Sequence, residues 1–138
     1  MRGAKVMKKN KGFTLLELLI TIAVIGIISS IAYPSYIDNI SRANRSEAQR
    51  ELLRLASLQE QYFIDHREYT ADMTKLGAAI DPYITDSGLY SIDTTVVGIT
   101  YTLVATAKGS QITDDSSCLT LSITDTGKKT ATSTHCWE

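Results

Sequence analysis

The segment Gly12-Phe13-Thr14-Leu15-Leu16-Glu17 begins a predominantly apolar run that continues to Ala32. This run, from Phe13 to Ala32, has 20 residues and one charge, that of Glu17. Twenty helical residues rise about 30 Å, which is the thickness of the hydrocarbon core of a bilayer. The sequence therefore predicts a membrane-spanning helix over residues 13–34. A carboxylate in such a helix costs about 2–3 kcal/mol unless it is paired, so Glu17 is a candidate functional residue.

The residues ahead of the apolar run carry five cations and no acid: Arg2, Lys5, Lys8, Lys9 and Lys11. Cations before a first apolar segment keep that end in the cytoplasm, so the rest of the chain is expected to face outward. Without these five cations the chain has 9 basic and 15 acidic residues, a net charge of −6. This excess of acid gives no general electrostatic case for binding nucleic acid.

The stretch from Gly12 to Leu19 resembles the class III signal of type IV pilins and pseudopilins, in which a prepilin peptidase cuts after the glycine and N-methylates the new terminus. The resemblance implies a leader of residues 1–12, cleavage between Gly12 and Phe13, and N-methyl-Phe13. It also implies that Glu17 meets the positive terminal amine, on Phe13, of a neighbouring subunit during assembly. Translation from Met7 would give a shorter leader, and the sequence leaves the choice between Met1 and Met7 open.

Two other interpretations stay open. A secretory signal peptide cleaved after Ala32 would give a soluble secreted protein, because Ser30-Ile31-Ala32 is an acceptable small-residue cleavage site. That interpretation leaves Glu17 without a role. A pseudopilin of type II secretion shares the N-terminal signal, but a C-terminal cysteine pair favours a pilus protein.

Gly26 and Pro34 predict a soft segment within the N-terminal helix. A glycine costs a helix about 1 kcal/mol relative to alanine. Pro34 cannot donate a hydrogen bond to the carbonyl of Ser30, and a proline inside a helix usually kinks it. In type IV pilins the matching segment can melt when subunits enter the filament, so the resemblance implies that role here. A static kink is the alternative.

Residues 35–138 predict a globular domain that begins with an amphipathic helix extending to about His66. Its apolar residues recur at steps of mostly three or four: Ile37, Ile40, Ala48, Leu52, Leu55, Leu58 and Tyr62. The charged residues between them are expected on a solvated face: Arg42, Arg45, Glu47, Arg50, Glu51 and Arg54.

Alternating apolar and polar residues predict strands in the second half of the chain. Residues 90–96 and 99–107 predict a β-hairpin, 119–124 a third strand and 128–133 a short fourth. Residues 69–77 predict a short helical turn that a glycine ends, and 109–117 a polar loop. The fold class is therefore α+β, with the amphipathic helix packed on a sheet of three or four antiparallel strands. This corresponds to the αβ-roll that the resemblance implies.

Cys118 and Cys136 are the two cysteines, and such a pair in an exported chain usually forms a disulfide. It would close a C-terminal region, 118–136, and contribute about 3 kcal/mol in the chain-entropy model. A metal site has little support, since no Cys-x-x-Cys occurs. Asp114 and Asp115 lack the spaced ligands of a calcium loop and are expected in a solvated loop. Lys128 and Lys129 predict a basic surface turn, with contact to a surface or to DNA as the alternative.

No motif for catalysis occurs, whether a Gly-rich phosphate loop, His-Glu-x-x-His or Gly-x-Ser-x-Gly. Four segments resemble PilE-type pilins of Gram-negative bacteria: Tyr33-Pro34-Ser35-Tyr36, Arg45-Ser46-Glu47-Ala48, Gln59-Glu60-Gln61-Tyr62 and Tyr69-Thr70-Ala71-Asp72. The late Cys118 with Cys136-Trp137 resembles the same group. The resemblance implies a non-enzymatic subunit of a type IV pilus, with a minor pilin favoured over a major one, that supports assembly, adhesion and twitching motility. It requires no cofactor or metal. The implied partners are other pilins, the prepilin peptidase and the inner-membrane assembly machinery, and the chain would pass from the inner membrane to the extracellular pilus.

Overall fold

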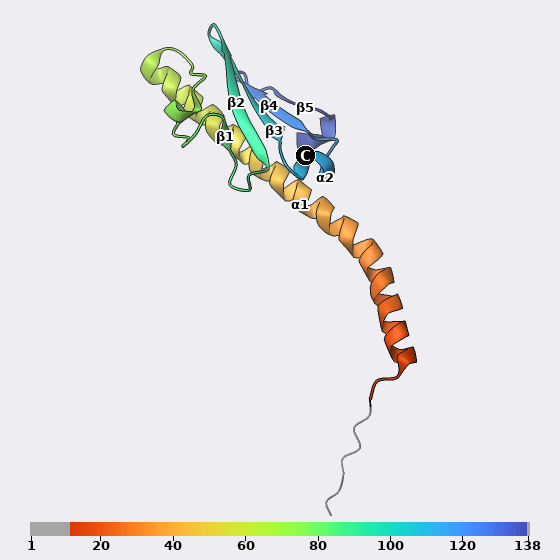
Figure 1. The fold of residues 1–138 in the computed structure, drawn as a ribbon. Coiled ribbons are helices and arrows are strands. Elements are labelled where there is room, and N and C mark those ends of the chain that lie inside the picture. Colours follow the sequence, from red (N-terminus) through yellow and green to blue (C-terminus); the bar gives the residue numbers. More distant parts are fainter. Residues whose placement is uncertain (1–11, 138) are drawn as a thin grey trace, which may run out of the picture. The chain divides into compact units, whose positions relative to one another are not determined.

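The computed structural model describes residues 12–137, which form two units that meet between Ser35 and Tyr36. Helix α1, Leu15–His66, contributes to both units, and all strands belong to the second (Figure 1). Residues 1–11 of the predicted leader lie outside the described residues.

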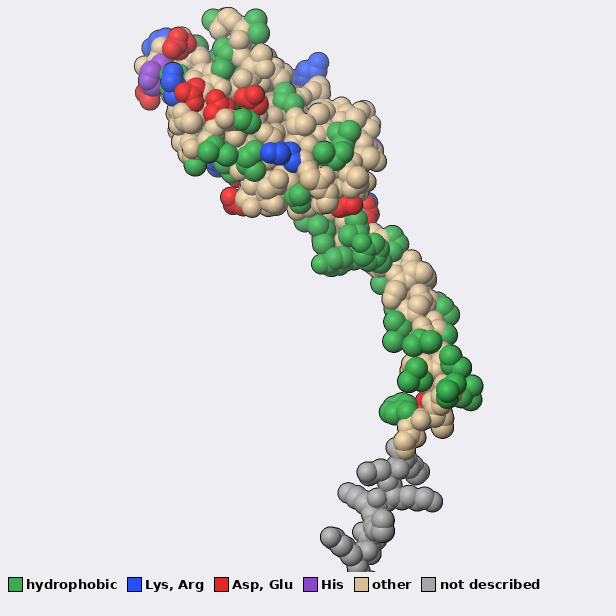
Figure 2. All heavy atoms as spheres, in the orientation of Figure 1, with side chains coloured by type: hydrophobic (Ala, Val, Ile, Leu, Met, Phe, Trp, Pro, Cys, Tyr) green, Lys and Arg blue, Asp and Glu red, His purple; other side chains and the backbone are tan. Residues whose placement is uncertain are grey.

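The first unit is the N-terminal part of α1, and its apolar side chains are exposed, as the hydrophobic atoms along it in Figure 2 show. Leu15 is 80% exposed and Ile31 is 72% exposed. By length and composition this helix could cross a membrane. The helix continues through both Gly26 and Pro34 without interruption.

The second unit is built on one antiparallel sheet in which each strand pairs with the next, in the order β1-β2-β3-β4-β5. The strands are β1 Tyr83–Ile84, β2 Tyr90–Val97, β3 Thr100–Ala107, β4 Thr120–Thr124 and β5 Lys129–Ala131. The α+β class, the β2–β3 hairpin and the later strands are confirmed. The sheet has five strands rather than three or four, because β1 has only two residues and is too short to show an alternating pattern.

Three short helical elements complete the second unit: η1 Met73–Leu76, α2 Gln111–Asp114 and η2 Thr134–Trp137. The predicted turn at 69–77 is confirmed by η1, where Asp72 Oδ1 accepts a bond of 2.9 Å from the Thr74 amide. Gly77 ends this turn with a φ of 84°, a left-handed conformation that glycine adopts without strain. The predicted loop at 109–117 is corrected, because it contains α2.

The hydrophobic core lies between α1 and the sheet. Ala48, Leu52 and Leu55 of α1 are fully buried, together with Tyr90 of β2 and Leu103 of β3. Burying a leucine contributes about 1.5–3 kcal/mol, so these residues hold α1 against the sheet. They confirm the centre of the predicted apolar stripe. Ile40 is 38% exposed and lies outside the core.

The buried face of α1 also carries polar residues, namely Ser41, Arg45 and Gln59. Gln59 Nε2 donates to the Thr70 carbonyl at 2.6 Å, and the Thr70 amide donates to Gln59 Oε1 at 3.1 Å. The prediction that Arg45 lies on a solvated face is wrong: it is 8% exposed. Arg45 follows Ser41 by four positions and precedes Ala48 by three, which places all three on one face of the helix.

Candidate functional site

Glu17 caps the N-terminal end of α1 together with Thr14. The Glu17 amide donates to Thr14 Oγ1 at 3.2 Å, and the Thr14 amide donates to Glu17 Oε2 at 3.3 Å. This reciprocal pair is a capping box, with Thr14 as the N-cap and Glu17 three positions later. Its signature, Thr-x-x-Glu, can be read in the sequence, and it gives Glu17 a role that the sequence predictions did not include.

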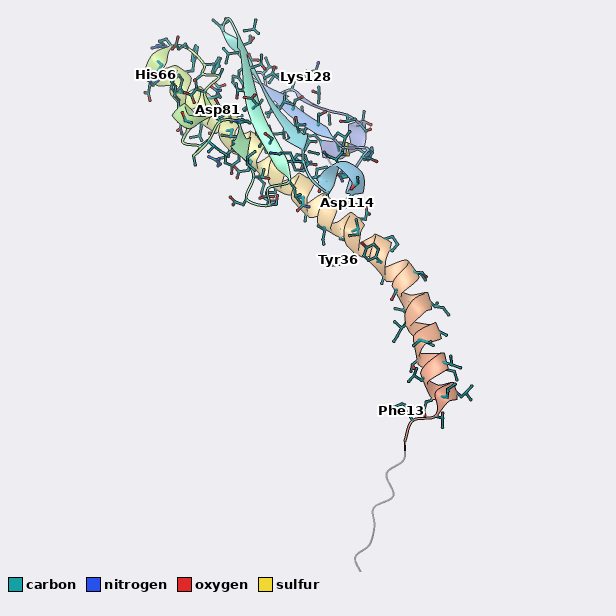
Figure 3. The ribbon with its side chains drawn as sticks, in the orientation of Figure 1. Phe13, Tyr36, His66, Asp81, Asp114 and Lys128 are labelled. Atoms are coloured by element: carbon teal, nitrogen blue, oxygen red, sulfur yellow. A yellow bond between two sulfur atoms is a disulfide. The ribbon has the colours of Figure 1, made fainter. Side chains whose placement is uncertain are left out.

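The same end of the helix is open to other molecules. Phe13 is 81% exposed and Leu16 is 67% exposed, and Figure 3 shows Phe13 just ahead of the first helical turn. Thr14 is the described side chain that contacts the Glu17 carboxylate, and both residues are exposed. The site therefore combines a surface carboxylate with an uncovered apolar helix.

Gly26 is not required by packing within the chain. A Cβ added there would meet no atom within 4 Å. Four residues later, Ser30 Oγ donates to the Ile27 carbonyl at 2.7 Å, in the turn that precedes Pro34. The helix is intact over this segment, and melting of residues 26–34 remains a prediction.

Cys118 and Cys136 form the predicted disulfide, with a Cα–Cα distance of 5.6 Å, and both are fully buried. Gln49 Nε2 of α1 donates to the Cys136 carbonyl at 2.7 Å, which joins the C-terminal region to the helix. The two sulfur atoms and a nitrogen of His135 lie within 4.8 Å of one another. The sulfurs are bonded to each other and are not thiolate ligands, so the disulfide form has no metal site here.

A buried polar cluster joins α1 to α2. Arg45 Nη1 lies 3.4 Å from Asp115 Oδ1 and 2.6 Å from Cys118 Sγ. Gln111 Nε2 lies 3.2 Å from Asp115 Oδ2, and it also contacts the Ser41 carbonyl at 3.1 Å. The prediction of a solvated loop is therefore wrong for Asp115, whose side chain is 10% exposed. Asp114 is exposed, as predicted, but it is the last residue of α2 and does not lie in a loop.

The cluster also contacts Tyr90, and burial changes the pKa of that residue. Gln111 Nε2 donates to the Tyr90 hydroxyl at 3.3 Å, and that hydroxyl donates to the Cys118 carbonyl at 3.4 Å. Burial raises the pKa of Tyr90 above its usual value, and the hydrogen bond from Gln111 opposes the rise. Burial likewise raises the pKa of Tyr101.

Lys128, in the connection between β4 and β5, and Lys129, the first residue of β5, are both exposed, as predicted. Lys129 Nζ lies 5.0 Å from the centre of the Trp137 ring, and Trp137 Nε1 donates to the Thr130 carbonyl at 2.8 Å. A cavity of about 310 Å³ adjoins this pair and is lined by Lys129, Thr130, Ala131, Ser133, Thr134 and Trp137. The arrangement combines cations, hydroxyls and one aromatic ring.

The two histidines do not form a catalytic set with other described residues. The His66 ring stacks on Tyr62 with centres 4.0 Å apart. His135 Nε2 lies 3.4 Å from Ser117 Oγ, but no carboxylate among residues 12–137 contacts that imidazole. A serine–histidine pair without an orienting acid lacks the third member of a nucleophilic triad.

Comparison with known proteins agrees with these features. The family model described as "Type IV minor pilin ComP, DNA uptake sequence receptor" matches residues 34–122, nearly two thirds of the chain. The chain belongs to the type IV pilins. A second model, "Prokaryotic N-terminal methylation motif", matches residues 7–33 of this pilin.

Named relatives of this pilin are pilins of other bacteria. A "Fimbrial protein" of Neisseria meningitidis serogroup A is 32% identical over 103 residues, covering 75% of this chain and 61% of the relative. The "Type IV major pilin protein PilA" of Myxococcus xanthus is 37% identical over 79 residues, 57% of this chain and 36% of the relative. A "Type IV major pilin protein PilE1" of Neisseria gonorrhoeae is 39% identical over 73 residues, 53% of this chain and 44% of the relative. The chain thus spans between about a third and three fifths of the length of these relatives, which are structural proteins by name.

Proposed function

We propose that this type IV pilin is a structural subunit that enters the pilus as a minor pilin and supports its assembly, adhesion and twitching motility. The observation that carries the proposal is the N-terminal part of α1, which exposes its apolar side chains and has one carboxylate, Glu17, at its capped end. A contiguous exposed apolar surface of this kind is typical of a segment that another apolar phase covers. Lipid covers it before assembly, and neighbouring pilin helices cover it in the filament.

Processing precedes assembly in this proposal. The prepilin peptidase cuts between Gly12 and Phe13 and methylates Phe13, which keeps the new terminal amine cationic. The cations ahead of the apolar run hold that end in the cytoplasm, so residues 35–138 face the periplasm and then the outside of the cell. The inner-membrane assembly machinery is the partner at the transfer from membrane to filament.

Gene deletion tests the pilus role against the pseudopilin alternative. We expect the deletion to reduce piliation or twitching and to leave type II secretion unchanged, with recovery on complementation by the wild-type gene. Quantitative mass spectrometry of sheared pili should find the chain in a small ratio to the main subunit. Loss of type II secretion with normal pili would assign the chain to the secretion system. A chain as abundant in sheared pili as the main subunit, or more abundant, would be the major pilin.

DNA contact is a second candidate function. The matching family model is described as a receptor for the DNA uptake sequence. This pilin has an exposed cation, Lys129, over the Trp137 ring, and a second exposed cation, Lys128, next to it in the chain. Lysine contacts to phosphates and stacking on an aromatic ring are the usual means of binding DNA. Its mature net charge of −6 means that such contact would be local.

Removing both lysines tests this second candidate. The double variant Lys128→Ala/Lys129→Ala should weaken duplex binding and lower the slope of log affinity against log salt by about 2, because each lost phosphate contact contributes about 0.9. Lys108→Ala removes an exposed lysine elsewhere and is the matched control. Equal DNA affinity and salt slope in the double variant and the wild type would exclude this turn as the DNA contact.

A further inference from the structure

A second polar cavity lies in the folded unit, and it shares no lining residue with the cavity beside Lys129 and Trp137. Its volume is about 350 Å³, and it is lined by Arg42, Arg45, Ser46 and His135. Two guanidinium groups, one hydroxyl and one imidazole therefore meet around a space at the lower end of the size range of small-ligand sites. Among the described residues, no carboxylate lines it.

Arg45 is the most deeply placed of these groups. Its side chain is 10% exposed, and a cation at this depth is costly unless its donors are satisfied. The contacts that it makes to described residues all use Nη1: Asp115 Oδ1 at 3.4 Å and Cys118 Sγ at 2.6 Å. A good charge-assisted N–H···O bond is about 2.7–2.9 Å long, so the pairing with Asp115 is loose. The guanidinium has five N–H donors and retains capacity for another acceptor.

Arg45 and Ser46 follow Arg42 by three and four positions, so both neighbour Arg42 on the surface of α1. Arg42 Nη2 pairs with Asp38 at 3.3 Å, but the two side chains are 68% and 66% exposed. An exposed pair of this kind contributes only about 0–1 kcal/mol. A better acceptor in the cavity can therefore take the Arg42 guanidinium at little cost.

His135 closes the cavity from the C-terminal end of the chain, and the disulfide fixes its position. It precedes Cys136, which is bonded to Cys118, and its Nε2 lies 3.7 Å from Cys118 Sγ. The same Cys118 sulfur contacts Arg45. Two segments that are 90 positions apart, at Arg45 and His135, are thus held against one sulfur atom.

We propose that this cavity binds a phosphate group. A tetrahedral oxyanion presents several acceptor oxygens, which suit two planar guanidinium forks, a hydroxyl and an imidazole N–H. Its negative charge would also meet the Arg45 cation that Asp115 satisfies only loosely. Free phosphate and the phosphodiester of nucleic acid share this chemistry. The inference is independent of the pilus role, and it rests on other side chains than those of the Lys128–Lys129 turn.

The test is an NMR titration of the full mature chain in a nonionic detergent, with inorganic phosphate as the probe and sodium chloride at matched ionic strength as the control. We expect saturable shifts at residues 42–46 and 135. Arg42→Gln and His135→Gln alter exposed side chains, and each should weaken phosphate binding by about tenfold. Arg50→Gln changes an exposed arginine of the same helix that does not line the cavity, and it should bind as the wild type does.

The result that would overturn the proposal is the absence of saturation, or an Arg42→Gln affinity equal to that of the wild type. Arg45→Lys provides a further variant that keeps the buried charge but removes the planar fork, and it should also bind phosphate more weakly. A short DNA duplex then identifies the source of the group. Displacement of phosphate from residues 42–46 would identify a nucleic-acid phosphodiester as a ligand, whereas duplex shifts confined to residues 128–129 would identify a free phosphate.

Discussion

At the scale of single residues, Glu17 caps α1, and we predict a second role for it that competes with the cap. In the isolated chain its carboxylate caps α1 through Thr14, an interaction of a kind that contributes about 0.5–2 kcal/mol. Pairing with the terminal amine of a neighbour's Phe13 would use the same oxygens. The exchange is favourable in an apolar environment, since a full positive charge attracts a carboxylate more strongly than an amide dipole does. Entry into the filament and the axial register of the helices would then both depend on Glu17, because lipid-facing Leu and Ile do not specify a register.

Two substitutions of Glu17 distinguish its capping of α1 from its predicted pairing with a neighbour's Phe13 amine. Glu17→Gln keeps a residue suited to a capping box but removes the charge, whereas Glu17→Val removes both. We expect both variants to be cleaved normally and both to be depleted from pili. Immunoblots of sheared pili and of membranes measure this. Wild-type amounts of Glu17→Gln in pili would assign Glu17 to the cap alone, and uncut precursor would assign it to recognition by the peptidase.

Tyr90 gives the folded unit a dependence on alkaline pH. Its pKa is raised in the folded state by burial, so the associated stability is fully present below the unfolded value of about 10 and declines as the pH rises above it. Thermal unfolding of the wild type should therefore shift to lower temperature above about pH 10. Tyr90→Phe should reduce the shift, with Tyr33→Phe, in the exposed part of α1, as its control. A melting temperature with the same pH dependence in Tyr90→Phe would contradict this assignment.

At the scale of elements, the segment from Gly26 to Pro34 is the part of α1 with the weakest intrinsic helix formation. Gly26→Ala with Pro34→Ala should strengthen it, since the glycine costs about 1 kcal/mol and the proline about 3 kcal/mol in a helix. No clash opposes the first change, because a Cβ at Gly26 meets nothing within 4 Å. Hydrogen exchange of amides 26–34 should slow, and filaments should become stiffer or fail to form. Normal filament rise and extensibility in a variant with slower exchange would show that assembly does not need melting.

The disulfide and the helix stabilise the C-terminal region together. Replacing Cys118 and Cys136 by alanine should lower the free energy of unfolding by about 2–5 kcal/mol. Gln49→Ala leaves the disulfide and removes one hydrogen bond to the Cys136 carbonyl, so its effect should be smaller, about 1 kcal/mol. Chemical denaturation of the three proteins measures this order. Equal stability of the cysteine-free chain and the wild type would show that the bond contributes nothing to the fold.

The parts of the fold that can be predicted are those that depend on patterns between residues close together in the sequence. The β2–β3 hairpin and β4 alternate clearly, and the buried leucines of α1 repeat at helical spacing, so these elements could be predicted. Arg45 and Asp115 could not be predicted as buried, because each is acceptable in the core only with a partner 70 positions away. Gln59 depends in the same way on Thr70. At the candidate site, the Thr14–Glu17 cap was readable from spacing, whereas the cavity beside His135 depends on the disulfide that brings the C-terminal region to α1.

At the scale of the whole molecule, we predict that assembly depends on one cut in the chain, between Gly12 and Phe13. Gly12 lacks a side chain, and its neighbour Phe13 would carry the new amine. Gly12→Val places a branched side chain at the cleavage point, and we expect an uncut precursor that stays in the membrane and does not reach pili. Mass spectrometry of the intact protein gives the mature terminus. A chain starting at Phe13 in that variant would refute the assignment, and one starting at Tyr33 in the wild type would support the secreted alternative.

The polar side chains that bond α1 to the rest of the folded unit have a mechanical consequence for a pilin in a filament. Gln59 with Thr70, Gln49 with Cys136 and Arg45 with Asp115 link one helix to three later parts of the chain. A pull along α1 loads these links in shear, so several must yield together before the helix slides. Residues 26–34 belong to the first unit, outside the folded unit that these links hold together, and we expect them to extend first. When nine residues pass from a helix, with a rise of 1.5 Å per residue, to an extended chain of about 3.5 Å per residue, the segment lengthens by roughly 18 Å. Each subunit would then extend under load while its folded unit stays intact.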